Sequence, residues 1–456
     1  MYSKRCQVLA AFNACLLKTS FGILLGFATI ALPNLELSLT QQSWFASLDF
    51  FSLTLIAPIG GMISGWFGRK ILFIIVPPLA SLGWILIGIS SSKLTLFSGR
   101  LLTCVTIALL NNTPLVYVSE IAHPEIRPVL SSIVGQSWGL GTSFAWILSY
   151  FCDWRTIAYL STIPLMVSMI TSLFLPESPY WLVEVGKVEK ALESLQFFRG
   201  SQHDISEEFT EMNQATKTKK DKTKIQLTIP TFWKPFSCIG VIFTLNTLSG
   251  FLALTNYLYD ILEESGSTFK TTMVVMVIGI LRLPLMVVAP TFAMKLNPQI
   301  AFVLGLTIKA LATLSMATYF HLYKTNPDQY QSFSWIPISM FFIEYVARST
   351  LIENVFHMLL GELFATEIRT LAVGITTSVV FLVGGLIIKF YPDMKALMGM
   401  DGLCYFYFGT IIVNIIWGYL SIPDNRSKSL ANIETSYSKS SDGEKASIKK
   451  PLINKT

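Results

Sequence analysis

Charged residues are scarce in this chain of 456 residues, and cysteine and histidine are scarcer still. Only 14% of the residues are Asp, Glu, Lys or Arg, whereas 52% are hydrophobic and Phe alone occurs 32 times. Soluble domains carry about 25% charged residues, so a soluble protein of two or three domains is excluded. The six Cys are scattered and form no CxxC motif, and the four His form no cluster with them. We therefore expect neither a disulfide framework nor a metal site.

The usual marks of an enzyme are also missing. The sequence shows no nucleophile–base pair, no metal motif and no glycine-rich loop that could hold a phosphate. We expect no covalent chemistry and no cofactor.

Long apolar runs, by contrast, fill most of the chain. Most runs have roughly 18–25 residues, the length that a helix needs to cross about 30 Å of hydrocarbon. The runs cover residues 9–32, 43–66, 70–90, 94–118, 130–151, 155–175, 232–260, 271–294, 299–321, 333–360, 371–391 and 401–421. The sequence predicts an all-α polytopic membrane protein with twelve transmembrane helices.

The distribution of Lys and Arg predicts the orientation. With the N-terminus in the cytosol, the inner segments carry 23 of these residues and the outer loops carry 6. Because positive charge accumulates on the cytosolic side, both termini are predicted to be cytosolic. This asymmetry accounts for the net charge of +6, so no nucleic-acid partner is needed; the expected surroundings are a lipid bilayer.

A polar stretch divides the runs into two sets of six. The predicted domains are a cytosolic N-terminus (1–8), a six-helix bundle (9–175), a cytosolic connector (176–231), a second six-helix bundle (232–421) and a disordered cytosolic tail (422–456). The connector contains the solvated charge run KTKKDKTK, and the tail is rich in Ser and Lys.

A small charged cluster occurs twice. SEIAHPEIRPVLSS (119–132) and GELFATEIRTLAVG (361–374) share two Glu, an Ile and an Arg at a constant offset of 242 residues. Both copies lie where a predicted span reaches the cytosol, and ion pairs of modest strength at such a place can break in every transport cycle. We interpret them as a cytosolic gate with partners in GRK (68–70) and PESPYWL (176–182). The gate candidates are Arg69, Glu120, Arg127, Glu177, Glu362 and Arg369.

These motifs resemble those of the sugar porters of the major facilitator superfamily, over residues 10–421. Within that family, the short termini and PESPYWLVEVGKVEKALESLQFFRG most resemble the insect facilitated trehalose transporters. The resemblance implies the major facilitator fold, two six-helix halves with a small-molecule substrate bound between them, and alternating access in a plasma membrane. In GMISGWFGRK, Gly65 and Trp66 replace the family's Asp and Arg, so the gate network is thinned.

The substrate positions that the resemblance implies have changed more than the gate. Gln136 lies one residue from a family Gln, Asn246 and Thr247 stand for a pair of Gln, Arg282 stands for an Asn, and His357 stands where a Trp stacks on the sugar. ENVFH replaces GPIPW in the tenth span, which predicts a straighter helix there. These five residues are the substrate-path candidates.

Charged residues within the predicted spans are costly and are treated as functional candidates. They include Asp49, Lys309, Glu344, Arg348 and Glu353. Glu344 and Arg348 are spaced for an i,i+4 ion pair, with Glu353 on the opposite face of the helix. Arg282 is expected to bind an anionic or phosphorylated ligand or to pair with Glu353; the sequence leaves both open.

The leading hypothesis is facilitated transport of a sugar, either trehalose or a hexose. Proton-coupled relatives carry an Asp in the first span where this chain has Leu24, which leaves Asp49 and His357 as candidate proton sites. The alternatives are a transporter of another small polar or anionic solute and a transport-inactive nutrient sensor. The oligomeric state stays open.

Overall fold

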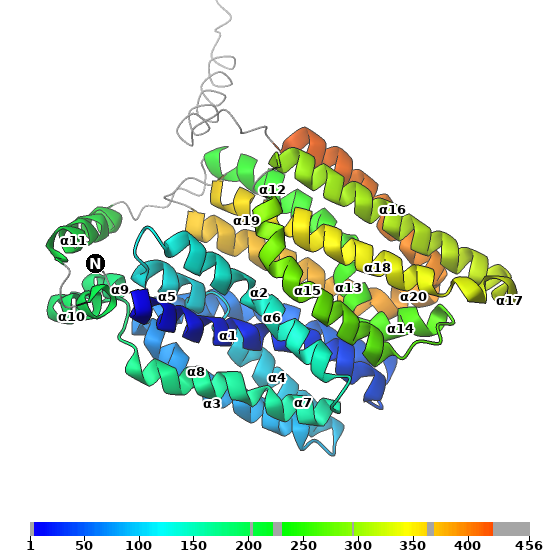
Figure 1. Ribbon diagram of the computed structural model, residues 1–456, viewed down its shortest axis with the longest axis horizontal. Coiled ribbons are helices and arrows are strands. Elements are labelled where there is room, and N and C mark those ends of the chain that lie inside the picture. The colour runs from blue at the N-terminus through cyan, green and yellow to red at the C-terminus, as the bar shows by residue number, and fades with distance from the viewer. Residues whose placement is uncertain (1–3, 201–203, 222–229, 294–295, 363–368, 423–456) are drawn as a thin grey trace, which may run out of the picture.

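The computed structural model describes residues 4–200, 204–221, 230–293, 296–362 and 369–422. Within these ranges the chain forms helices and short connections, without a β-strand. Figure 1 shows the helices lying roughly parallel. The N-terminal end of α1 and the connector helices lie at one end, called the connector end below, and α17 lies at the other.

The N-terminal half consists of long helices joined by tight turns. Its helices are α1 (Lys4–Ala31), η1 (Leu32–Asn34), α2 (Leu39–Phe67), α3 (Arg69–Gly88), α4 (Lys93–Leu109), α5 (Thr113–Ile121), α6 (Arg127–Leu148), α7 (Trp154–Leu160) and α8 (Thr162–Phe174). Polar caps set several boundaries. Ser38 and Gln41 form a reciprocal capping box at the start of α2, and Asp153 caps α7 by accepting from the Thr156 amide.

The C-terminal half is more interrupted. Its helices are α12 (Pro230–Leu248), α13 (Phe251–Asn256), α14 (Leu258–Glu264), α15 (Thr271–Ala293), α16 (Pro298–Thr325), α17 (Pro327–Tyr330), η2 (Gln331–Phe333), α18 (Trp335–Ala347), η3 (Arg348–Ile352), α19 (Glu353–Glu362) and α20 (Arg369–Ser421). The segment η3 is a π-helical turn, and α20 contains a break at Gly399, whose φ is +72°.

The connector, for which the sequence predicts only a polar cytosolic segment with one solvated charge run, contains helices. It folds into α9 (Pro179–Glu184), α10 (Val188–Arg199) and α11 (Ser206–Asp221), and its first two helices pack on the N-terminal half. Arg199 is buried, donates to the Ile121 carbonyl at 2.8 Å and pairs with Glu208 at 2.6 Å. Residues 222–229, which include the last three residues of the charge run, and the predicted tail after Ile422 lie outside the described residues.

Eight helical stretches among the described residues are long and apolar enough to cross a membrane. The last of them, Val373–Ser421, has 49 residues and includes two of the predicted runs, separated by the break at Gly399. The predicted runs 130–151, 271–294 and 333–360 are helical but do not reach this threshold. Large apolar side chains such as Leu55, Phe174 and Leu420 are more than two-thirds exposed, as expected of a surface that faces lipid.

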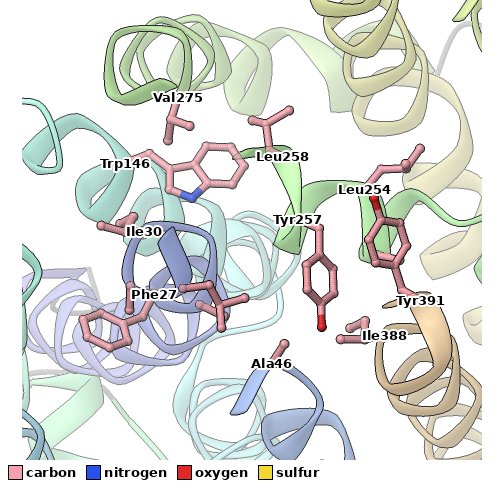
Figure 2. Close-up of a cluster of buried hydrophobic side chains, with 14 of the residues drawn as sticks. Phe27, Ile30, Ala46, Trp146, Leu254, Tyr257, Leu258, Val275, Ile388 and Tyr391 are labelled. Atoms are coloured by element: carbon pink, nitrogen blue, oxygen red, sulfur yellow. The ribbon is translucent and has the colours of Figure 1, made fainter. Parts of the chain in front are cut away.

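The two halves share one apolar core. Figure 2 shows Trp146 of the N-terminal half beside Leu258 of the C-terminal half, in a cluster that also includes Phe27 and Leu254. Hydrogen bonds also join the halves: the Thr29 hydroxyl donates to the Thr255 carbonyl at 3.0 Å, and Lys389 Nζ donates to Ser43 Oγ at 2.8 Å. Both contacts lie toward the end of the molecule opposite the connector.

Candidate functional site

A cavity of about 530 Å³, including the part that opens to solvent, lies between the two halves. Aromatic, hydroxyl, amide and charged side chains contribute to its wall. The lining residues are Leu25, Phe50, Trp138, Thr142 and Trp146 from the N-terminal half, and Phe251, Leu252, Thr255, Asn256, Arg282, Tyr345, Arg348, Ser349 and Glu353 from the C-terminal half. A mostly apolar wall with a few polar groups is typical of a small-molecule site.

Helix α6 supplies one side of the cavity. Trp138, Thr142 and Trp146 are four residues apart, so they form one stripe along the helix. This stripe is held by close packing of α6 on α1: Thr142 Oγ1 donates to the Gly22 carbonyl at 2.9 Å, and Trp146 Nε1 donates to the Gly26 carbonyl at 3.3 Å. A Cβ on Gly22 would lie 1.6 Å from the Trp138 carbonyl oxygen, so glycine is needed there.

A break in the seventh predicted span supplies the facing side. The helix α12 ends at Leu248, and Gly250 has a φ of +80°, which favours glycine. The short α13 that follows presents Phe251, Thr255 and Asn256 to the cavity. Asn256 Oδ1 is buried and has no hydrogen-bond partner among the described residues, so it can accept a hydrogen bond from a ligand.

Arg282 of α15 is the cation that lacks a carboxylate partner in this cavity. Its residue is 5% exposed, and its guanidinium carbon lies 4.3 Å from the Trp138 ring centroid and 5.4 Å from that of Tyr345. Stacking of a desolvated cation on aromatic faces contributes about 2 kcal/mol. Arginine within a membrane costs about 2.5–3.5 kcal/mol, so the aromatic faces offset part of that cost. They accept none of its N–H groups in hydrogen bonds.

Arg348 and Glu353 form an ion pair in the same wall. Arg348 Nε and Glu353 Oε1 are 2.9 Å apart, and the guanidinium also lies 4.3 Å from the Phe251 ring centroid. The predicted i,i+4 pair of Glu344 with Arg348 is wrong, and so is the placement of Glu353 on the opposite face from Arg348. The π-helical turn 348–352 adds a residue to the helical turn, which brings position i+5 over position i. The tenth span is helical from Trp335 to Glu362, but the π-helical turn makes it irregular, and the predicted straighter helix stays a prediction.

Glu344 pairs instead with Lys309 of α16. Both side chains are fully buried, with Nζ and Oε1 3.3 Å apart. Lys309 Nζ also contacts Ser249 Oγ, at the end of α12 beside the helix break. A buried pair of this kind compensates two charges that would be costly alone, and here it joins α16 and α18 to the break.

Asp49 has a partner that the sequence analysis overlooked. Asp49 and Arg100 are both fully buried, and Oδ2 lies 3.5 Å from Nη2. Arg100 also donates to the Phe45 and Leu24 carbonyls, each at 3.3 Å. The presence of Arg100 within the predicted run 94–118 was the signal that would have revealed it.

Three of the other predicted substrate residues, Gln136, Asn246 and Thr247, do not line the described wall of this cavity. Gln136 is half-buried on α6; Asn246 and Thr247 are buried on α12, where Thr247 donates to the Phe243 carbonyl at 2.8 Å. The side chain of His357 lies outside the described part of the chain. Of the five predicted positions, the cavity includes Arg282.

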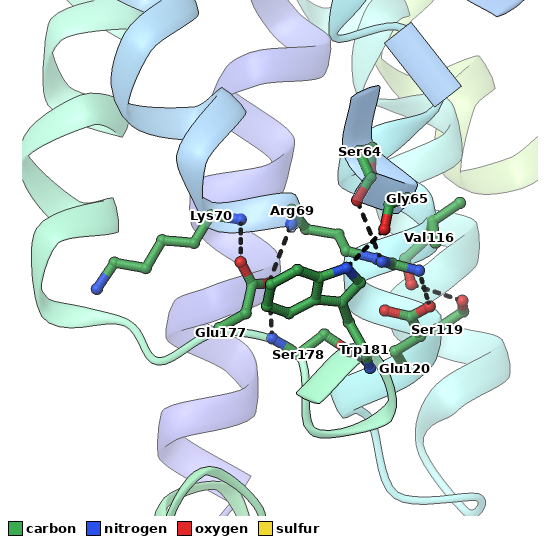
Figure 3. A network of polar contacts seen from close by, with 10 residues as sticks. All are labelled: Ser64, Gly65, Arg69, Lys70, Val116, Ser119, Glu120, Glu177, Ser178 and Trp181. Carbon is green, nitrogen blue, oxygen red and sulfur yellow. Dashed lines mark hydrogen bonds and ion pairs between the residues drawn. The ribbon is translucent and has the colours of Figure 1, made fainter. Parts of the chain in front are cut away.

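At the connector end, the gate candidates Arg69, Glu120 and Glu177 lie together (Figure 3). Arg69 Nη2 and Glu120 Oε1 are 2.8 Å apart. Glu177 accepts the backbone amides of Arg69 at 3.1 Å and Lys70 at 3.0 Å, a favourable position for a carboxylate at the N-terminus of α3. Trp181 Nε1 donates to the Gly65 carbonyl at 2.7 Å. These contacts tie the α2–α3 turn to α5 and to the start of the connector.

Arg127 behaves differently from the expectation that it reaches a neighbouring bundle. Its Nε and Nη2 both donate to the Ala122 carbonyl at 3.3 Å, so it closes its own turn. In the second copy, the backbones of Glu362 and Arg369 are helical, but their side chains and residues 363–368 lie outside the described residues.

Sequence reasoning missed the wall formed by Trp138, Thr142, Trp146 and Asn256. A period of four between aromatic and hydroxyl residues was visible in α6, although such a stripe alone does not separate a cavity wall from a packed core. Among the described residues, no group of three or more His, Cys, Asp or Glu is placed to hold a metal ion.

Comparisons with known proteins agree with this architecture. The sequence model of the family described as "Sugar (and other) transporter" matches residues 14–437. The facilitated trehalose transporter Tret1 of Polypedilum vanderplanki is 24% identical over 449 residues, which cover 94% of this chain and 87% of that protein. The facilitated glucose transporter member 8 of solute carrier family 2 from Bos taurus is 24% identical, with 93% of each chain covered.

A solved structure shares the fold. The inward-open xylose transporter XylE from E. coli superimposes with a TM-score of 0.74 at 17% identity, covering 94% of this chain and 98% of XylE. At that identity the likeness concerns the fold, which is that of the major facilitator superfamily.

Proposed function

Because the chain belongs to the sugar (and other) transporter family, we propose that it carries a sugar across a membrane by facilitated transport with alternating access. The observation that carries the proposal is the cavity between the two halves, within a chain that the family model matches over residues 14–437. Relatives named as trehalose and glucose transporters make these two sugars the first substrates to test.

The chemistry of the wall suits a sugar ring. Trp138, Trp146 and Tyr345 offer aromatic faces, on which the C–H faces of a ring can pack. Thr142 and Ser349 offer hydroxyl groups, and Asn256 offers an acceptor that lacks an internal partner. Polar groups of this kind orient a ligand and determine its specificity. The predicted Gln136, Asn246, Thr247 and His357 remain candidates for other positions along the path.

Alternating access needs contacts that form on one side of the substrate while others break. The hydrogen bonds Thr29–Thr255 and Ser43–Lys389 support a state closed at the end opposite the connector. At the connector end, Arg69, Glu120 and Glu177 would belong to the gate that closes in the other state. Arg127, Glu362 and Arg369 are assigned to the same gate by the repeat.

Facilitated transport, without proton coupling, is favoured by the surroundings of Leu24. The backbone carbonyl of Leu24 accepts from Arg100, whose charge is compensated by Asp49. Asp49 is fully buried and does not line the cavity. A carboxylate in that position is better suited to holding helices together than to exchanging protons with solvent.

The membrane placement is part of the proposal. Positive residues are concentrated in the connector and the two terminal segments, which supports a cytosolic connector end and cytosolic termini in a plasma membrane. The transport unit would be the two six-helix halves, 9–175 and 232–421. We propose no catalytic role for the chain.

Uptake into proteoliposomes tests the function directly. Purified chain is reconstituted, and entry of labelled trehalose and glucose is measured with and without an inward proton gradient. We expect saturable uptake that the proton gradient does not change. Leu252→Trp, which fills the cavity, should abolish uptake. Leu311→Trp should not abolish it, because Leu311 is 62% exposed on the surface of α16. Flux no greater than in empty vesicles would contradict sugar transport.

The gate is tested separately by the double variant Arg127→Ala, Arg369→Ala. If both copies of the repeat form the gate, uptake should fall strongly while substrate binding is retained. Normal uptake by this variant would show that the repeated cluster does not act as a gate. It would not contradict sugar transport.

A further inference from the structure

Arg282 lacks a partner of opposite charge although it is almost fully buried. Its residue is 5% exposed and lines the cavity, and among the described residues no carboxylate lies within ion-pair distance and no acceptor takes its N–H groups. Two other cations of the C-terminal half that lie within predicted helices pair with carboxylates: Lys309 with Glu344, and Arg348 with Glu353. Arg282 is therefore placed to receive a group from outside the chain.

The wall of the cavity carries three charged side chains. They are Arg282, Arg348 and Glu353, and the last two neutralise each other at 2.9 Å. One positive charge remains unbalanced. A carboxylate brings one negative charge, whereas a phosphate monoester brings about 1.5–2 at pH 7 and would leave the site negatively charged. The charge balance therefore selects a single carboxylate.

The geometry of Arg282 fits the same group. Its guanidinium carbon lies over the rings of Trp138 and Tyr345, 4.3 Å and 5.4 Å from the two ring centroids. No acceptor among the described residues takes the N–H groups of Arg282 in a hydrogen bond, and a guanidinium can bind a carboxylate with two parallel hydrogen bonds. The aromatic faces and Asn256 Oδ1 would then hold the ring and a hydroxyl of the same solute.

We propose that the preferred substrate is a sugar acid, a sugar ring that carries one carboxylate, bound by Arg282 through that carboxylate. This inference rests on the proposed sugar transport and narrows its substrate class. A consequence follows from charge conservation: each turnover carries one negative charge, so net uptake responds to membrane potential, whereas uptake of a neutral sugar does not.

The test compares three probes in proteoliposomes that contain the full chain: labelled glucose, glucuronate and glucose 6-phosphate. We expect glucuronate to enter and to compete with glucose at lower concentration than glucose 6-phosphate does. A potential that is positive inside, set with a potassium gradient and valinomycin, should accelerate glucuronate entry and leave glucose entry unchanged. Arg282→Gln should raise the half-saturating glucuronate concentration about ten- to hundredfold, a larger factor than that by which it raises the half-saturating glucose concentration.

Two controls keep the outcomes distinct. Arg5→Gln removes an exposed cation at the connector end and should behave as the wild type. Arg282→Lys retains the charge without the planar fork and should give an intermediate affinity; it also serves if Arg282→Gln fails to fold.

The wild-type chain alone can overturn the inference. If glucose enters, but glucuronate neither enters nor inhibits glucose uptake, the sugar-acid proposal is refuted. The proposal of sugar transport would still hold. Stronger competition by glucose 6-phosphate than by glucuronate, or glucuronate competition unchanged in Arg282→Gln, would also refute it. Absence of flux for all three probes and for trehalose would instead contradict the proposed function.

Discussion

Arg348 and Glu353 form an ion pair across a π-helical turn, with Nε and Oε1 2.9 Å apart. In a regular α-helix, residues five positions apart differ by about 140° in direction, so these side chains would not meet. The extra residue of the turn 348–352 thus determines which carboxylate faces Arg348. Because Glu353 faces Arg348, Glu344 is available to pair with Lys309, and Arg282 has no carboxylate partner in the cavity.

A double-mutant cycle tests this pair. Arg348→Gln and Glu353→Gln should each lower the melting temperature, because each leaves the other charge poorly compensated next to the cavity. The double variant should lose less stability than the sum of the losses of the two single variants. The difference, the coupling free energy, should be about 0.5–3 kcal/mol. Thermal unfolding of the purified chain in detergent gives the values. Additive effects would show that the contact contributes nothing.

The helix break at Gly250 is expected to be intolerant of any side chain. At Gly250 φ is +80°, and a Cβ would lie 2.2 Å from the Tyr407 ring. Gly250→Ala should therefore cost about 1–2 kcal/mol for the backbone and a further amount of about 1–3 kcal/mol for overpacking.

The matched control for that variant is Gly240→Ala in α12, where a Cβ would meet nothing within 4 Å. It should be neutral or slightly stabilising, because alanine favours the helix. Melting temperatures of the two variants, with glucose uptake at a temperature where both are folded, separate strain from function. Equal stability of the two variants would contradict the importance of the break.

Asp49 is predicted to be structural. Asp49→Asn leaves Arg100 as an uncompensated buried charge, and removal of one partner of such a pair costs about 3–5 kcal/mol. Replacement of both, as Asp49→Leu with Arg100→Met, should restore much of the stability. The measurement is the yield and melting temperature of each variant, with the exposed Glu36→Gln as the control.

Transport by the folded Asp49→Leu, Arg100→Met variant completes that test. Since facilitated transport does not use a proton at Asp49, uptake should remain independent of the proton gradient. A wild type whose uptake rises with an inward proton gradient, and a variant that loses this response, would assign Asp49 to proton coupling instead.

The Arg69–Glu120 contact should affect the rate of transport more than substrate affinity. The pair lies at the connector end and includes no cavity residue, so Glu120→Gln should lower the maximal uptake rate and change the half-saturating concentration little. The loss of a hydrogen bond between charged groups should also cost about 1–3 kcal/mol of stability. Initial uptake rates over a range of glucose concentrations distinguish the two parameters. A change confined to affinity would place the contact outside the gate.

The sequence by itself determined the class of protein and its helical plan. Apolar runs long enough to span a bilayer, with 14% charged residues, allow little besides a polytopic helical membrane protein, because backbone polar groups in lipid must bond within their own helix. The motifs at 119–132 and 176–200 were sufficient to recognise the family, and they brought Arg69, Glu120 and Glu177 into one prediction. Arg69, Glu120 and Glu177 lie near the ends of helices. Helix ends can be located from the sequence, because polar and turn-forming residues accumulate there.

Only the tertiary structure decided which buried charges meet. Lys309 pairs with Glu344 across two helices, and Arg100 pairs with Asp49 51 residues away, neither of which has a local signature. The π-helical turn changed the face of Glu353, since one added residue shifts every direction that follows it. The spacing of residues along each helix is a local property of the sequence, but the cavity around Arg282 depends on how α6, α13 and α15 pack, and that packing is a property of the whole chain.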